Sequence, residues 1–168
     1  EENLKQVYKI DQAPSDTGMR KILDKVNLQE LKGVFKGLVN KLRKVGIWKN
    51  DEYFRGHIIC SVDGVHHFSS ENICCAQCME YKKTNGKVEY RHYLLSGSIV
   101  HPEKKEVMPI IHEPIVKQDG LEKNDCERNA AKRLMPDLRK LFPEEKLIVV
   151  EDALSANGPH IRVLNKED

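Results

Sequence analysis

The spacing of apolar residues changes along the chain, from a helical period in the first third to strand-like runs afterwards. Apolar residues recur three and four positions apart from Leu28 to Val45, directly behind the capping residue Asn27, which predicts an amphipathic helix. A shorter helix is predicted over residues 17–26, behind a Pro-Ser-Asp start signal. Gly46 ends the long helix.

Beyond residue 56 the pattern predicts β-strands. Residues 57–62 form an apolar, partly β-branched run that ends at Asp63. Residues 89–100 and 105–116 are two further β-rich runs joined by a polar turn, so we expect a hairpin of long strands beside the first. The run 146–150, apolar after Lys146, is typical of a central parallel strand covered on both faces.

Two helices are predicted in the second half of the chain. Asn124 or Asp125 caps the first, and Pro136 inside its apolar pattern is expected to kink or split it. The segment "NGPH" predicts a final helix with Pro159 at its first position. The order is therefore three strands, a helix, a strand and a helix behind a helical N-terminal segment, which indicates an α/β fold.

The composition fits a single domain with a substantial core. Of the 168 residues, 39% are hydrophobic and 32% are charged, which is not the composition of a disordered chain. The net charge of +2 does not by itself indicate nucleic acid, so such a partner must be recognised by local patches. No apolar run has the length of a membrane span and no signal-peptide pattern opens the sequence, which predicts a cytoplasmic protein.

One basic patch lies on the polar face of the long predicted helix. A solvated helix face is the ordinary interpretation of such a pattern. The alternative is a surface that contacts nucleic-acid phosphates. The candidate residues are Lys32, Lys36, Lys41, Arg43 and Lys44.

Two aspartates, Asp63 and Asp152, each follow a predicted core strand. If the two strands are neighbours, the carboxylates meet at one edge of the sheet, where open α/β sheets place their sites. Such oxygen ligands suit Mg²⁺ or Mn²⁺, and a pair of these ions can activate a nucleophilic oxygen and stabilise the leaving oxygen of a phosphodiester. The alternative is that each Asp starts a turn. The order of elements favours the metal site, because ribonuclease H-like nucleases place acidic ligands on the first strand and at the end of the fourth.

Five cysteines, three of them clustered, argue against a secreted disulfide scaffold. Cys75 and Cys78 form a CxxC pair, and with His92 on the next predicted strand they suit a structural Zn²⁺. The candidates for a fourth ligand are Cys74, His66 and His67, although adjacent cysteines seldom ligate one ion. The alternatives are buried or free thiols and, least favoured, a redox dithiol, because the pair does not open a helix after a strand.

Other acidic residues are open to simpler explanations. Glu113 lies on an apolar predicted strand and is a candidate for a third carboxylate at the site. Asp125 and Glu127 open a predicted helix, where the helix macrodipole alone favours negative charge, so we assign them a structural role.

Five segments of the sequence resemble the DDE-type transposases of bacterial insertion sequences, from about residue 10 onwards. They are "PSDTGMRKILDKV", "SVDGVHHFSSENICCAQC", "YRHYLLSGSIVHPEKKEVMPI", "EPIVKQDGLEKNDCERNAAKRL" and "KLIVVEDALSANGPHI". The resemblance implies a ribonuclease H-like catalytic core in which three acids bind two Mg²⁺ ions, cleave the element ends and join the 3′-hydroxyl to target DNA. Asp63 is similar to the first acid of that family and Asp152 to the second.

The resemblance also implies an organisation and partners. Residues 1–50 would be a helical segment that contacts DNA, and residues 56–168 a partial ribonuclease H-like core with a Cys-rich insertion at 71–92. The insertion resembles a segment of the family that matches Cys74, Cys75, Cys78 and His92. The expected partners are insertion-sequence ends and target DNA, with a homodimer for the full-length protein, in the bacterial cytoplasm at the nucleoid.

Two departures from the family limit the expected activity. Val65 stands where relatives carry Thr, and the third acid, a Glu on a later helix, has no counterpart here. We therefore expect a transposase fragment that is inactive alone. The alternatives are a non-catalytic nucleic-acid-binding or interaction remnant of a transposase, and a small metal-dependent nuclease that uses Glu113 as its third carboxylate.

Overall fold

The structure is a computed structural model that describes residues 2–23, 25–26, 28–117 and 126–166. Its contacts divide the chain into an N-terminal unit, residues 1–34, and a core unit, residues 35–168. The division falls inside one helix, α3 (Leu28–Lys44). Each unit is described by itself below.

The N-terminal unit consists of helices. It contains α1 (Glu2–Tyr8), α2 (Asp16–Leu23) and the first part of α3. The side-chain oxygen of Ser15 accepts a hydrogen bond from the Gly18 backbone N–H at 3.2 Å, as the predicted start signal requires. The helix predicted over residues 17–26 therefore forms, but it ends at Leu23.

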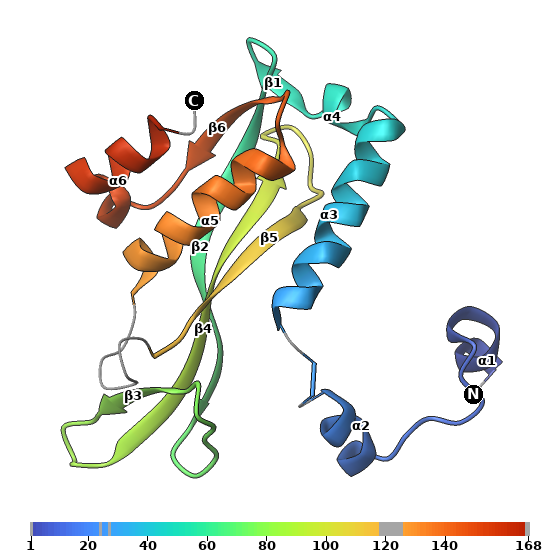
Figure 1. Cartoon of the computed structure of the whole chain (residues 1–168), viewed down its shortest axis with the longest axis vertical. Helices are drawn as coiled ribbons and strands as arrows, with labels where there is room; N and C mark the ends of the chain where they lie inside the picture. Colours follow the sequence, from blue (N-terminus) through green and yellow to red (C-terminus); the bar gives the residue numbers. More distant parts are fainter. Residues whose placement is uncertain (1, 24, 27, 118–125, 167–168) are drawn as a thin grey trace. The chain divides into compact units, whose positions relative to one another are not determined.

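The core unit contains a mixed six-stranded sheet (Figure 1). Its strands are β1 (Glu52–Phe54), β2 (His57–Ser70), β3 (Met79–Lys82), β4 (Val88–Val100), β5 (Met108–Ile115) and β6 (Lys146–Val150). Strand β4 pairs antiparallel with β2, β3 and β5, and β1 pairs antiparallel with β2. Strand β6 pairs with β2 in parallel. The predicted hairpin and the predicted parallel strand are both confirmed.

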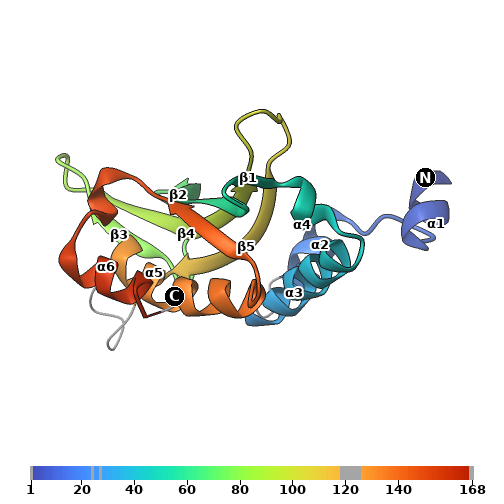
Figure 2. The ribbon, with the colours of Figure 1, turned by 90° about the horizontal axis from the view of Figure 1, so that it is seen from above.

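The helices of the core unit are α4 (Ile47–Asn50), α5 (Glu127–Leu141), the 3₁₀ turn η1 (Ala153–Ser155) and α6 (Gly158–Leu164), with the C-terminal part of α3. Figure 2 shows α5 and α6 on the same face of the sheet. Pro136 does not split α5, because Leu134, Met135 and Leu138 around it are buried in the core. The residue that caps α5 is Cys126, whereas the predicted caps Asn124 and Asp125 lie outside the described residues.

The core lies between α5 and the sheet. Cys60 and Val62 of β2 and Leu95 of β4 are buried on the face that α5 covers, opposite the fully buried Ala130 and Leu134 of the helix. These residues alternate along the strands with half-buried or exposed ones, as a sheet with one covered face requires. The second half of α3 belongs to the same core, where Val39 is fully buried.

Two predictions about strands are wrong in detail. Strand β2 does not end before Asp63 but continues to Ser70, because β4 pairs with it along this whole length. Strand β6 is not covered on both faces: its residues are half-buried or exposed, and β2 is its partner within the described sheet. None of the helices in the described part of the chain has both the length and the apolar character needed to cross a membrane.

Candidate metal centre and carboxylate site

The parallel pairing of β2 and β6 brings Asp63 and Asp152 together. The last paired residues are Ser61 and Val150. Asp63 and Asp152 each follow two residues later, Asp63 within β2 and Asp152 beyond the end of β6. Both residues therefore lie at the carboxyl end of the parallel pair. Asp63 is exposed, and its Oδ1 accepts a hydrogen bond from the Gly64 N–H at 2.7 Å.

A third carboxylate, that of Glu127, approaches this pair from the first turn of α5. A Cβ atom added to Gly64 would lie 2.1 Å from Glu127 Oε1, so the missing side chain at residue 64 is what leaves room for the carboxylate. Burial raises the pKa of Glu127, and the charges of Asp152 and Asp63 raise it further. The macrodipole accounts for a carboxylate at the start of α5, but it did not predict that Glu127 lies near Asp63 and Asp152. The glycine after Asp63 was the feature of the sequence that could have indicated this approach, and its role is seen only in the packing of α5 against β2.

The three carboxylates are not gathered as tightly as the ligands of a single ion. Among the described residues, one group of three or more metal-ligating side chains has all its donor atoms within 4.8 Å of one another, and it is the Cys75, Cys78 and His92 group.

The structure does not bring Glu113 to this pair. Its register partner on β4 is Leu95, whereas that of Asp63 is the adjacent Ser96, so the two acids lie on opposite faces of the sheet. Glu113 is buried and accepts a hydrogen bond from Arg133 Nε at 2.7 Å. This buried ion pair gives the residue a structural role.

A buried histidine supports the strand end that carries Asp152. His160 of α6 is 4% exposed, and its Nε2 lies 2.5 Å from Glu151 Oε2, one residue before Asp152. The side chain of Asn157 caps α6 by accepting a hydrogen bond from the His160 N–H at 3.1 Å. This pair was not predicted, because nothing in the spacing of residues 151 and 160 indicates that α6 folds back onto β6.

The second site is formed by two thiols and an imidazole. Sγ of Cys75 and Sγ of Cys78 are 3.7 Å apart, and His92 Nε2 lies 3.3 Å from the first and 3.2 Å from the second. Tetrahedral zinc, with bonds of about 2.3 Å to sulfur and about 2.0 Å to nitrogen, would place its ligands about 3.8 Å (S to S) and about 3.5 Å (S to N) apart. The predicted set of Cys75, Cys78 and His92 could therefore hold a metal ion such as zinc.

The surroundings of this group also suit a metal. The Cys75 N–H donates to Cys78 Sγ at 3.2 Å and the Gln77 N–H donates to Cys75 Sγ at 3.4 Å, and such donors stabilise thiolates. Burial lowers the pKa of His92, as does the charge of His67, which favours the neutral imidazole that binds metals. Burial raises the pKa of Cys78, an effect that a coordinated cation overrides. Cys74 is exposed and lies outside the group.

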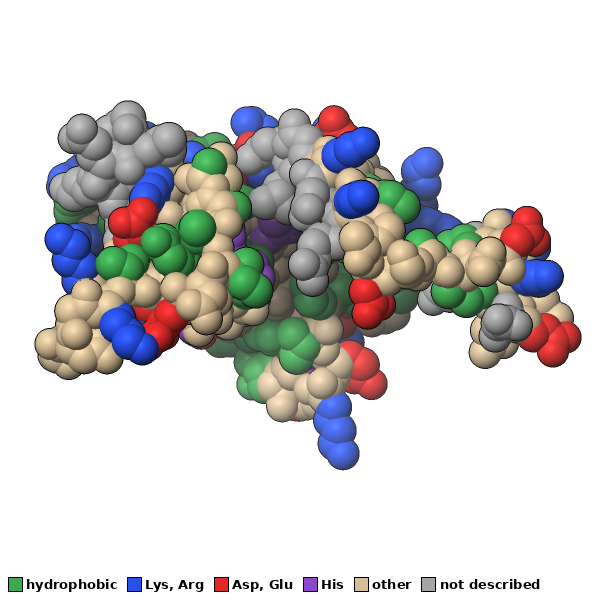
Figure 3. All heavy atoms as spheres, turned by 90° about the horizontal axis from the view of Figure 1, so that it is seen from below, with side chains coloured by type: hydrophobic (Ala, Val, Ile, Leu, Met, Phe, Trp, Pro, Cys, Tyr) green, Lys and Arg blue, Asp and Glu red, His purple; other side chains and the backbone are tan. Residues whose placement is uncertain are grey.

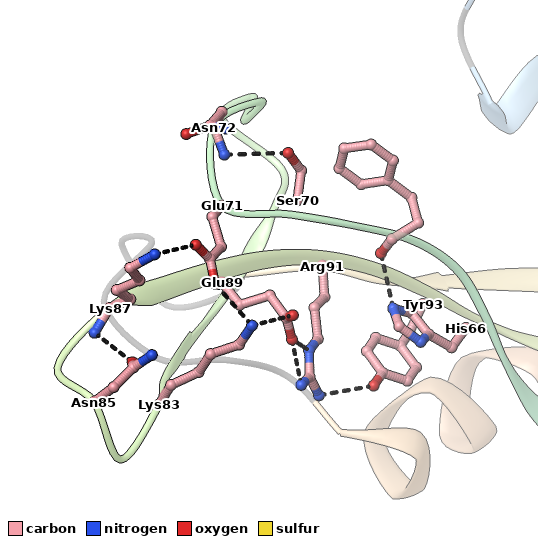
Figure 4. A network of polar contacts seen from close by, with 11 residues as sticks. His66, Ser70, Glu71, Asn72, Lys83, Asn85, Lys87, Glu89, Arg91 and Tyr93 are labelled. Carbon is pink, nitrogen blue, oxygen red and sulfur yellow. Dashed lines mark hydrogen bonds and ion pairs between the residues drawn. The ribbon is translucent and has the colours of Figure 1, made fainter.

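A network of exposed ion pairs joins the segments around the thiols (Figure 4). Glu71 accepts hydrogen bonds at 3.0 Å from both Lys83 and Lys87, and Lys83 also lies 2.8 Å from Glu89. Glu89 also pairs with Arg91. Hydrogen bonds from Lys87 and Lys83 lower the pKa of Glu71. We call residues 66–93, which this network spans, the distal arm.

The basic residues predicted to contact DNA differ in their burial and contacts. Arg43 donates from Nε to Glu145 Oε1 at 2.6 Å and from a second nitrogen to the Leu141 carbonyl at 2.6 Å, so it ties α3 to the end of α5. Lys36, Lys41 and Lys44 are exposed. On the face shown in Figure 3, described Lys and Arg side chains alternate with Asp and Glu. Lys32 belongs to the N-terminal unit.

Comparison with protein-family models, with curated proteins and with solved structures finds no match to this chain.

Proposed function

We propose that this chain is a ribonuclease H-like domain of the transposase type, which acts on DNA with the help of divalent cations. The observation that carries the proposal is the parallel pairing of β2 and β6, since Asp63 and Asp152 both follow the last paired residues and both act on the carboxyl group of Glu127. The order of elements and the five segments that resemble DDE-type transposases support the same function. Insertion-sequence ends and target DNA are the proposed substrates.

The donor set fits Mg²⁺ or Mn²⁺. Carboxylate oxygens are the hard ligands that these ions prefer, and an ion between Asp63 and Asp152 would offset the charges that raise the pKa of Glu127. The bound ions would supply polarisation of the phosphodiester and activation of the attacking oxygen. The chain itself would hold the ions through Asp63 and Asp152.

Glu127 is a better candidate than Glu113 for a third carboxylate. It adjoins Gly64, and the charges of both aspartates act on it, whereas Glu113 forms a buried ion pair with Arg133. We therefore expect Glu127 to contribute to cation binding beside the two aspartates.

The first test is Mn²⁺ binding, measured by the loss of the free-ion electron paramagnetic resonance signal. We expect Asp63→Asn and Asp152→Asn each to weaken binding at least tenfold, and Glu127→Gln to weaken it less. Glu106→Gln is the matched control, because Glu106 is an exposed acid in the β4–β5 turn. Equal binding by all four variants would contradict the proposed site.

The second test is metal-dependent nicking of a DNA duplex. We expect weak nicking that Asp63→Asn abolishes and EDTA prevents. A non-catalytic DNA-binding module is the competing function, and the exposed Lys36, Lys41 and Lys44 favour it. That function predicts salt-dependent gel shifts that survive the loss of both aspartates and weaken when these lysines are replaced by Ala.

We also propose that Cys75, Cys78 and His92 hold Zn²⁺ in a structural role. The three donor distances support this proposal, since each lies within a few tenths of an ångström of a tetrahedral zinc edge. Metal analysis of the purified protein should give about one zinc per chain. Cys78→Ser should lose it, and Cys126→Ser, a change at an exposed thiol outside the group, should retain it.

A further inference from the structure

The fourth position of the proposed zinc site is the feature from which more can be inferred. Structural zinc sites are almost always closed by four protein ligands, whereas an open position is typical of catalytic zinc. Three donors converge at Cys75, Cys78 and His92. The identity of the fourth ligand therefore decides whether the metal braces the distal arm or presents a reactive position.

A second histidine, His67 of β2, lies beside this group. In the pairing of β2 with β4, His66 lies opposite Tyr93 and Phe68 opposite His92, so His67 is an extra residue with no partner in the register. Such a β-bulge re-aims side chains and is frequent next to functional sites. The ring of His67 lies against that of His92, with centroids 5.8 Å apart and planes 29° from parallel.

The other candidates are less well placed. His66 is held elsewhere, because its Nε2 lies 2.9 Å from the Phe68 carbonyl oxygen and its ring stacks on Tyr93 with centroids 4.5 Å apart. Figure 4 shows His66 beside Tyr93. Cys74 precedes Cys75 directly, and adjacent cysteines seldom ligate one ion; Cys74 and His67 both lie outside the group of donors within 4.8 Å, but the ring of His67 contacts that of His92.

We propose that His67 is the fourth ligand and closes a Cys₂His₂ site that clamps the bulge of β2, the 71–78 loop and β4 together. Two imidazoles on one tetrahedral zinc have ring centroids about 5 Å apart. The 5.8 Å between the ring centroids of His67 and His92 is close to this spacing, and a side-chain rotation of the exposed His67 would bring its ring to the ion. The proposal rests on the zinc site proposed above.

The clamp would add to the apolar contacts through which Met79, Tyr81 and Tyr93 of the distal arm pack in the core. The ion pairs of Glu71 with Lys83 and Lys87 in Figure 4 are solvent-accessible, and such pairs contribute little to stability. A structural zinc contributes its binding free energy to the folding of the segments that it joins. The ring contact of His67 with His92 places His67 beside the three donors.

The test compares His67→Ala with the matched control His66→Ala in the full chain. Zinc affinity is measured by competition with a chromogenic chelator, and the ligand set by the visible absorption of the Co²⁺-loaded protein. We expect His67→Ala to weaken zinc binding at least tenfold and to change the Co²⁺ spectrum. His66→Ala should leave both close to those of the wild type.

The outcomes separate this inference from the zinc site itself. If the wild-type protein binds no zinc or Co²⁺, the three-ligand site is wrong and the inference fails with it. If the wild type binds zinc but His67→Ala keeps the same affinity and spectrum, the site stands and the inference about His67 is overturned. In that case, a changed spectrum in Cys74→Ser would identify Cys74 as the fourth ligand instead.

Discussion

At the scale of single residues, an absent side chain shapes the carboxylate site. Gly64 lies between Asp63 and Val65 on β2, and Glu127 of α5 occupies the space where a Cβ would stand. The glycine is thus needed for a close approach between elements. Asp63 is held in place by the pairing of β2 with β4. Gly64 thus provides space for Glu127, whereas Asp63 provides a carboxylate.

We predict that Gly64→Ala displaces Glu127 and weakens Mn²⁺ binding. The new Cβ would lie 2.1 Å from Oε1, which is the far end of a flexible side chain and can rotate away. The loss of unfolding free energy should therefore be small, about 1 kcal/mol or less. Urea denaturation and Mn²⁺ titration measure the two effects. Gly37→Ala in α3, where nothing lies within 4 Å of the added Cβ, should not weaken Mn²⁺ binding and should raise stability.

Cysteine reactivity gives a second prediction at this scale. Burial, together with the charge of Glu151, raises the pKa of Cys60 to about 12. At pH 8 the native protein should therefore react with iodoacetamide at the exposed Cys74 and Cys126 long before it reacts at Cys60. Peptide mapping by mass spectrometry measures the rates, and in urea all cysteines should react alike. Modification of Cys60 at the rate of Cys126 would show that Cys60 is not buried.

At the scale of elements, Arg43 and Glu145 hold α3 against the end of α5. Their ion pair joins residues far apart in sequence, and the side chains are 26% and 14% exposed. The same guanidinium donates to the Leu141 carbonyl, the last residue of α5. A residue predicted to bind DNA phosphate thus has a packing role, because α3 and α5 meet in the tertiary structure.

We predict that this contact makes stability depend on pH. Burial alone would raise the pKa of Glu145, but hydrogen bonds from Arg43 and the backbone outweigh it, and the pKa is lowered. The contribution should be complete above the ordinary carboxyl pKa of about 4.3 and lost as the pH falls through the lower folded value.

Denaturation with urea at pH 7 and at pH 3 tests this dependence. Glu145→Gln should destabilise the protein by about 1–3 kcal/mol at pH 7 and by clearly less at pH 3. Glu144→Gln, at the exposed neighbouring position, is the control and should have little effect at either pH. The same loss for Glu145→Gln at both pH values would contradict the assignment.

At the scale of the whole molecule, the core and the distal arm depend on different interactions. The core buries apolar residues between α5 and the sheet. The arm continues the antiparallel pair of β2 and β4, contacts the core through Met79, and holds the thiols, His92 and the ion pairs of Figure 4. Removal of a metal should therefore affect the two regions unequally.

We predict that a zinc chelator exposes the arm to trypsin while the core resists. The expected first cuts follow Lys82, Lys83 and Lys87, which lie in or beside the β3–β4 turn. Mass spectrometry of timed digests identifies the cuts, and added Zn²⁺ should restore resistance. Equal rates of cutting with and without the chelator would argue against a metal in the arm.

Local patterns in the sequence were sufficient to predict most of the elements. The helical period of α3, the apolar runs of β4, β5 and β6 and the Asn-Gly-Pro start of α6 all correspond to elements of the structure. The three donors Cys75, Cys78 and His92 were also predicted together, because two lie three residues apart and the third lies on the next long strand. Periodicity and short spacings report interactions that are local in the chain.

Other features follow from contacts between segments that are distant in sequence, and only the tertiary structure decided them. Because β2 pairs with β4 along its whole length, β2 continues past Asp63. The packing of α5 against the sheet places Glu127 at Gly64 and Arg133 beside Glu113. Charge and residue type alone could not distinguish the two glutamates. The sequence by itself determined which elements form and which donors are near neighbours along the chain, because those depend on local propensity. The fold determined which carboxylates meet, because that depends on sheet register and helix packing.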